Sequence, residues 1–91
     1  MIPDNRKLLI IRGDLEAQKD IEKIIKNFFG AAAHQVVKSA VGGSFELVYG
    51  ISASQIKKAS RKKSVDIVQE LMKLEGVASA NLIEQTDDIG R

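Results

Sequence analysis

The sequence predicts an α+β fold of the ferredoxin-like type, a βαββαβ sandwich in which two helices cover one face of a four-stranded antiparallel sheet. Three observations lead to this prediction. Four segments have the apolar pattern of strands, two have the 3.6-residue period of amphipathic helices, and a Gly-Gly pair joins the two middle strands. Because 91 residues make one domain, we expect a single domain over residues 7–84, between a flexible lead-in (1–6) and a flexible acidic tail (85–91).

The first strand is expected over residues 7–12 and is apolar on both faces. Leu8 and Ile10 lie on one face, and Leu9 and Ile11 lie on the other. This pattern is typical of a strand in the middle of a sheet.

The first helix is expected over residues 15–29, with Asp14 as its N-cap and Gly30 at its C-terminal end. Its apolar residues recur at the spacing of one helical face, and they are Ala17, Ile21, Ile24, Ile25 and Phe28. Charged residues occupy the opposite face, so we expect the apolar stripe to pack on the sheet.

Two strands are expected over residues 34–41 and 45–52. Gly42 and Gly43 lie between them, and glycine tolerates the positive φ angles of a tight hairpin. The second strand alternates cleanly, and its core-facing residues are expected to be Phe45, Leu47, Tyr49 and Ile51.

The remainder of the domain is expected to hold a connection, a second helix and a last strand. Residues 53–63 are polar and basic and are expected to form the connection, with at most a turn of helix. The second helix is expected over residues 64–75, capped by Ser64 and ended by Gly76, before a strand over residues 77–84. The residues expected to be buried between the two helices and the sheet are Ile24, Phe28, Val68 and Leu71.

In this fold one face of the sheet is left without helices. One apolar face of the first strand must point to that side, and a large exposed apolar patch normally marks an interface. We expect this open face to pack against a second copy of the chain, through Leu9, Ile11, Val48 and Ile83.

The composition excludes several chemistries. The chain has no cysteine, so disulfides, thiolate catalysis and cysteine-ligated metal sites are absent. His34, the single histidine, has no acid or hydroxyl partner at a catalytic spacing, and Asp87 and Asp88 have no further ligands for a metal. We therefore expect no enzyme activity, no cofactor and no metal.

A basic strip is the densest charged signal in the sequence, and it consists of Lys57, Lys58, Arg61, Lys62 and Lys63. Such a strip can bind phosphate groups of nucleic acid or of an anionic membrane, or it can be a solvated loop. An RNA-recognition motif has the same element order but needs exposed aromatic residues on its central strands. Residues 7–12 contain none, and Phe45 and Tyr49 belong to the face expected to pack on the helices, so nucleic acid is disfavoured.

Two segments, Gly43–Tyr49 (GSFELVY) and Glu70–Leu82 (ELMKLEGVASANL), resemble the C-terminal cytosolic domain of a family of uncharacterised prokaryotic membrane proteins. The chain is also similar to the ACT-like C-terminal domains of MgtC/SapB-type membrane proteins. These resemblances imply a ferredoxin-like domain attached to an N-terminal membrane-spanning part. The ACT comparison further implies a small-ligand site at the turn formed by Arg12, Gly13, Asp14 and Leu15.

The expected function is that of a non-catalytic regulatory or assembly domain that acts through dimerisation. No segment has the roughly 20 apolar residues of a span, so the expected location is cytoplasmic. The resemblance implies the cytosolic face of a membrane if the parent protein has transmembrane spans. The expected partners are a second copy, the membrane-spanning part of the same protein and, through the basic strip, anionic lipid. The alternatives are an ACT-like sensor of a small ligand and a basic module that binds RNA or anionic lipid.

Overall fold

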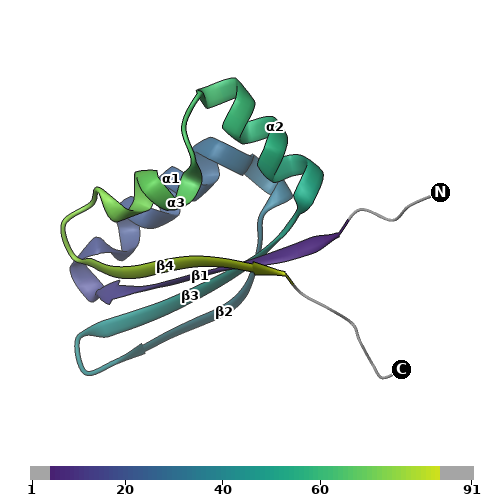
Figure 1. Cartoon of the computed structure of the whole chain (residues 1–91). Helices are drawn as coiled ribbons and strands as arrows, with labels where there is room; N and C mark the ends of the chain where they lie inside the picture. Colours follow the sequence, from purple (N-terminus) through teal and green to yellow (C-terminus); the bar gives the residue numbers. More distant parts are fainter. Residues whose placement is uncertain (1–4, 85–91) are drawn as a thin grey trace, which may run out of the picture.

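The computed structural model of the chain describes residues 5–84 and has two layers, with helices on one face of a sheet (Figure 1). Its strands form one antiparallel sheet in the order β2-β3-β1-β4, which confirms the predicted α+β, ferredoxin-like fold. Part of the expected lead-in and all of the expected tail lie outside the described residues. The elements in chain order are β1 (Arg6–Asp14), the 3₁₀ turn η1 (Leu15–Ala17), α1 (Gln18–Phe29), the 3₁₀ turn η2 (Gly30–Ala32), β2 (His34–Val41), β3 (Ser44–Ser52), α2 (Ala53–Lys63), α3 (Ile67–Met72) and β4 (Val77–Glu84).

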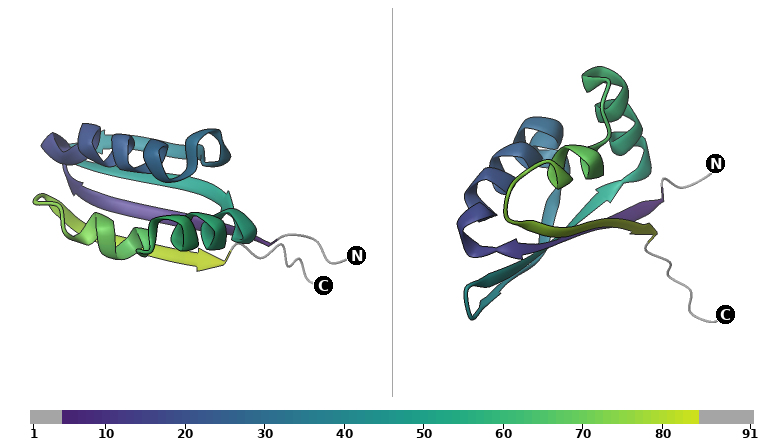
Figure 2. Two further views of the ribbon diagram at one scale, coloured as in Figure 1. Left: turned by 90° about the horizontal axis from the view of Figure 1, so that it is seen from above. Right: turned by 60° about the vertical axis from the view of Figure 1, so that its left-hand side comes forward.

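The core lies between the sheet and the helices. β1 is central, paired with β3 on one side and with β4 on the other, so both of its backbone edges are hydrogen-bonded within the sheet. Figure 2 shows α1 lying beside α2 and α3 across the sheet. The large side chains with less than 2% exposure all belong to this layer, and they are Leu9, Ile11, Ile21, Leu47, Ile51 and Leu71.

Residues 53–63 form the helix α2, whereas the sequence led us to expect a connection. The hydroxyl of Ser52 accepts a hydrogen bond from the backbone N–H of Gln55 at 3.3 Å and so caps the helix. Ala59 is buried, and Ile56 packs against the core beside it. Lys, Arg, Gln and Ala are good helix formers, so the Ser52 cap and the packing of Ile56 and Ala59 favour a helix in this polar segment.

The expected helix over residues 64–75 is shorter than predicted. Ser64 adopts a left-handed conformation (φ 60°, ψ 23°) and ends α2 rather than starting a new helix. The N-cap of α3 is Asp66, whose carboxylate accepts a hydrogen bond from the N–H of Gln69 at 3.2 Å. α3 therefore begins at Ile67, and its buried residues Ile67 and Leu71 share one face.

The apolar stripe of α1 is rotated relative to the prediction. Ile21, Ile25 and Phe29 are buried, four residues apart, while Ile24 and Phe28 are partly buried at the side of the core. The ammonium group of Lys63, on α2, lies over the Phe28 ring at 5.6 Å from the ring centroid. Phe28 therefore lies at the contact between two helices. Phe29 occupies the core position that the sequence led us to assign to Phe28.

Candidate functional site

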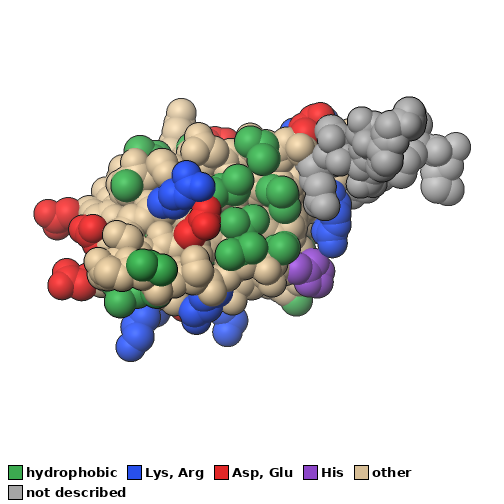
Figure 3. All heavy atoms as spheres, turned by 90° about the horizontal axis from the view of Figure 1, so that it is seen from below, with side chains coloured by type: hydrophobic (Ala, Val, Ile, Leu, Met, Phe, Trp, Pro, Cys, Tyr) green, Lys and Arg blue, Asp and Glu red, His purple; other side chains and the backbone are tan. Residues whose placement is uncertain are grey.

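The open face of the sheet carries an apolar patch. Strand alternation directs Leu8 and Ile10 of β1 to this face, and the register sets Ile10 opposite Val48 of β3 and Leu8 opposite Ile83 of β4. Viewed from the sheet side, apolar side chains gather in one cluster on this surface (Figure 3). The apolar patch is defined by Leu8, Ile10, Val36, Val37, Val48 and Ile83.

Members of the apolar patch remain partly accessible to solvent. Val36 is 60% exposed, Ile83 is 46% exposed and Val37 is 39% exposed. Val48 is buried by its neighbours on the same face, at 9% exposure. The apolar patch therefore has a buried residue, Val48, at its centre and solvent-exposed apolar residues at its edges.

The expectation that Leu9 and Ile11 belong to the open face is wrong. Both have 0% exposure and lie under the helices. The first strand is apolar on both faces, so its own pattern does not show which face points to the helices and which to the open side. The deciding signal is Arg12, which shares a face with Leu8 and Ile10 and carries a charge that a core cannot accept unpaired.

A bulge in β2 adds two valines that strict alternation would separate. The register between β2 and β3 shifts between Gln35 and Val37. Val37 lies opposite Val48, and a Val36 methyl carbon lies 3.6 Å from the position where Gly50 would carry a Cβ. Both valines therefore belong to the open face. A bulge leaves no clear mark in the sequence, which is why Val36 and Val37 were not predicted.

A charged pair borders the apolar patch. The Arg12 guanidinium contacts one carboxylate oxygen of Glu46 through Nη2 at 2.8 Å and through Nε at 3.0 Å. Arg12 and Glu46 are register partners on β1 and β3. A polar rim beside an apolar centre is the usual composition of a protein interface.

The residues of the expected small-ligand turn, Arg12 to Leu15, do not converge. Arg12 points to the open face, whereas Gly13 is buried between the strands. The N–H of Asp14 donates to the carbonyl of Gly76 at 2.8 Å, and the N–H of Leu15 donates to the carbonyl of Gly43 at 2.8 Å. These two amide groups, which could otherwise hold a ligand carboxylate, are bonded within the chain.

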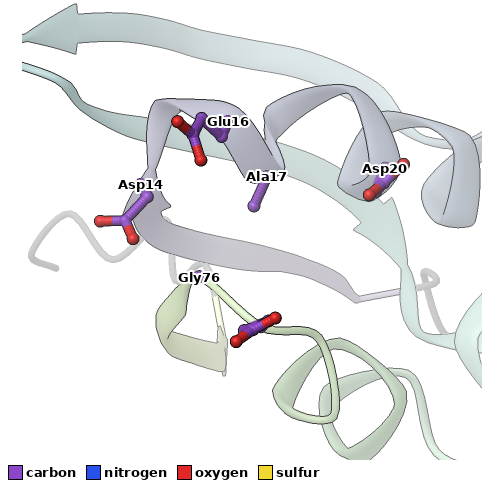
Figure 4. Close-up of a pocket in the computed structure, with 6 residues that line it drawn as sticks. Asp14, Glu16, Ala17, Asp20 and Gly76 are labelled. Atoms are coloured by element: carbon purple, nitrogen blue, oxygen red, sulfur yellow. The ribbon is translucent and has the colours of Figure 1, made fainter.

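A shallow hollow beside this turn is acidic (Figure 4). Its lining residues are Asp14, Glu16, Ala17, Asp20, Glu75 and Gly76. The clustered carboxylates repel an anionic effector. Within residues 5–84, no group of three or more His, Asp or Glu side chains is arranged to hold a metal ion.

The basic strip forms the outer side of α2. Lys57, Lys58, Arg61 and Lys62 are exposed, and Lys63 is half-buried over the Phe28 ring. Within the part of the chain that the structure describes, none of the five forms an ion pair. The strip therefore lies on a helix, whereas the sequence led us to expect a connection, and its binding to phosphate groups stays a prediction.

Tyr49 is the one side chain in the described part of the chain whose pKa is resolved as shifted. Burial raises the pKa of its hydroxyl above 10.0, the hydrogen bond from Gln35 lowers it, and the negative charge of Glu22 raises it. The Gln35 side-chain amide donates to the Tyr49 hydroxyl at 3.2 Å. Tyr49 faces the helices, so this polar contact belongs to the core of the domain.

In comparisons with known proteins, the chain matches no protein-family model and none of the curated protein sequences. Among residues 5–84, no helix combines the length and the apolar composition that a membrane span requires. The class that fold and surface define is therefore a ferredoxin-like α+β domain with an apolar open sheet face and a basic helix.

Proposed function

We propose that the chain is a non-catalytic regulatory or assembly domain that acts by forming a homodimer, and that it is the cytosolic part of a membrane protein. The apolar patch on the open face of the sheet carries the first part of this proposal. Burying exposed apolar side chains such as Val36 and Ile83 against the same side chains of a second copy removes them from water.

The size of the open face fits a homodimer. Strands of eight or nine residues rise about 3.3 Å per residue and lie about 4.8 Å apart, so four of them present a flat area of about 500 Å². Side-chain relief makes the accessible area larger than this flat area. A standard interface buries about 800 Å² on each partner, which is of the same order.

A two-fold axis through the patch makes the interface self-complementary. In a closed dimer the same surface meets itself, and no surface is left to recruit a third copy. The apolar patch would form the centre of such an interface, and the Arg12–Glu46 pair would lie on its polar rim.

Charge substitutions in the patch test the dimer. We expect the unmodified domain to sediment as a dimer at tens of micromolar, and Val36→Lys or Ile83→Glu to weaken that dimer at least tenfold, because each buries an unpaired charge. The matched control is Met72→Lys, since Met72 is an exposed apolar residue (48%) on α3, away from the sheet. A domain that remains monomeric at several hundred micromolar, or equal weakening by Met72→Lys, would contradict the proposal.

Attachment to a membrane rests on the resemblance of Gly43–Tyr49 and Glu70–Leu82 to cytosolic domains of membrane proteins. An antibody against the domain should find it in the membrane fraction of its native cells, and a wash with 1 M salt should not release it. Full recovery in the soluble fraction would contradict this part of the proposal and leave the dimer untouched. The salt wash separates covalent attachment to a membrane part from electrostatic adsorption.

A further inference from the structure

The four exposed cations of α2, here called the α2 basic face, share one side of the helix. They are Lys57, Lys58, Arg61 and Lys62. At 3.6 residues per turn they fall within an arc of about 140°. The buried residue Ala59 lies on the opposite side of the helix. The side of α2 that faces away from the domain is thus cationic.

These cations repel one another in the isolated domain. Lys57 and Arg61, and likewise Lys58 and Lys62, are spaced i, i+4, and like charges at this spacing destabilise a helix. α2 contains no Asp or Glu, and no acidic side chain among residues 5–84 pairs with its cations. The helix dipole favours Arg61 and Lys62 in the last turn, but it gives no reason for Lys57 and Lys58. An external anionic partner would remove this repulsion.

The shape of the α2 basic face fits a flat partner. In Figure 1 and in the right-hand view of Figure 2, α2 rises away from the sheet at one end of the molecule. On the neighbouring helix α1, Phe28 contacts α2 through its ring, which lies under the ammonium group of Lys63. Lys57 and Arg61 border an open hollow with Ile56 and Ser60. Long, exposed side chains such as these can reach a plane of anionic groups beyond the hollow.

The aromatic residues argue against single-stranded nucleic acid. Binding of single strands depends on exposed aromatic rings that stack on bases. Phe29, Phe45 and Tyr49 are buried, and Phe28 is half-buried with Lys63 over its ring. No ring is left beside the α2 basic face for stacking.

We propose that the α2 basic face binds the surface of an anionic phospholipid bilayer. Clusters of four or more Lys and Arg residues adsorb to anionic lipid, and each cation adds to the attraction. The exposed arc of α2 has no large apolar side chain, so the helix lies on the headgroups and does not insert. This binding is distinct from the dimer, because the apolar patch is on the opposite side of the molecule from the helices.

Vesicle co-sedimentation tests the proposal. The unmodified chain should bind vesicles of 30% phosphatidylserine in phosphatidylcholine at 50 mM salt and should not bind pure phosphatidylcholine. Binding should fall about tenfold or more at 300 mM salt, because exposed charges are screened. Lys58→Glu/Lys62→Glu should lower binding at least tenfold. Circular dichroism should be unchanged, since both side chains are exposed.

The matched control is Lys19→Glu/Lys73→Glu, which changes the net charge by the same amount at the other end of the helix layer. This variant should keep binding to within about twofold. Equal loss in the control, binding to neutral vesicles, or no effect of Lys58→Glu/Lys62→Glu would overturn the proposal. Binding to a duplex or single-stranded RNA that an excess of anionic vesicles does not displace would overturn the assignment to lipid. Sedimentation of the free protein measures the dimer independently, so failure of one proposal is distinguishable from failure of the other.

Discussion

Gly13 shows how one residue fixes the geometry of the sheet. β1 and β4 come so close at this point that a Cβ on Gly13 would collide with the carbonyl oxygen of Gly76 and lie 3.0 Å from the Cα of Val77. The register between the two strands also shifts at Arg12 and Gly13. Glycine is therefore needed here for close approach, whereas the sequence alone indicated only the end of a strand.

Phe29 and Phe28 are adjacent but differ in what they stabilise. Phe29 is 8% exposed and belongs to the core, so Phe29→Ala should lower the free energy of unfolding by about 3–5 kcal/mol. Phe28 is half-buried at the contact with Lys63, so Phe28→Ala should lower it by only about 1–2 kcal/mol. Urea denaturation of both variants measures the two values. Equal losses would contradict the rotated packing of α1.

Tyr49 makes stability depend on pH in the alkaline range. Its pKa is raised in the folded state, chiefly by burial, so the folded chain retains this proton at a pH where the unfolded chain has lost it. The contribution is fully present below pH about 10, the pKa of an unperturbed tyrosine, and is lost as pH rises through the folded pKa. Tyr49→Phe removes this titration.

Urea unfolding at pH 8 and pH 11 tests this linkage. Both proteins carry the same lysines, so only the difference between their pH slopes reports Tyr49, and the unmodified domain should lose more stability than Tyr49→Phe. The variant also lacks the hydrogen bond from Gln35, but that loss is the same at pH 8. Identical slopes for the two proteins would count against a raised pKa.

At the scale of elements, α2 is the main structure that the sequence did not predict. Its apolar residues are only Ala53, Ile56 and Ala59, and its five cations resemble a solvated connection. The cap made by Ser52 and the fit of Ala59 against the core are tertiary contacts that periodicity does not reveal. The strands were easier to predict, because β3 alternates cleanly between apolar and polar residues and because Gly42 and Gly43 mark the hairpin.

The end of α2 offers a stabilising substitution. Ser64 is the non-glycine residue with positive φ in the described part of the chain, and a left-handed conformation disfavours residues with a Cβ by about 1–2 kcal/mol. Glycine adopts it freely but gains entropy in the unfolded state, so Ser64→Gly should raise stability by up to about 1 kcal/mol. Thermal unfolding measures the change, and Ser54→Gly, near the start of the same helix, should lower stability instead. A destabilising Ser64→Gly would argue against the left-handed end of α2.

At the scale of the whole molecule, a net charge of +2 conceals a strong separation of charge. The acidic hollow around Asp14, Glu16 and Asp20 lies where β1 ends, and the α2 basic face lies at the opposite end of the helix layer (Figure 1). The overall charge count is a property of the composition alone. It gave no information on polarity, because that depends on which ends of the strands the fold brings together.

The fold class was predictable because hydrophobic periodicity reports which elements are buried, and six elements in this order leave few topologies. The composition of the open face was only partly predictable. Val48 and Ile83 follow from alternation. The choice of Leu8 and Ile10 over Leu9 and Ile11 does not follow from the apolar pattern of β1, and the charge of Arg12 on the face of Leu8 and Ile10 is the signal that decides it. The valines brought to the open face by the bulge in β2 leave no such signal.

The pairing of β1 with β4 has a consequence for the order of events on the ribosome. Lys7 lies opposite Glu84, so both edges of β1 can be bonded only after residues 77–84 have been synthesised. Until then β1 can pair only with β3, and its other backbone edge is open to a neighbouring nascent chain. The apolar side chains on both faces of β1 favour such a contact. Ribosomes that follow one another closely on the same message would thus present matching unfinished sheets, and the speed at which the last strand emerges would govern how much of the protein escapes aggregation.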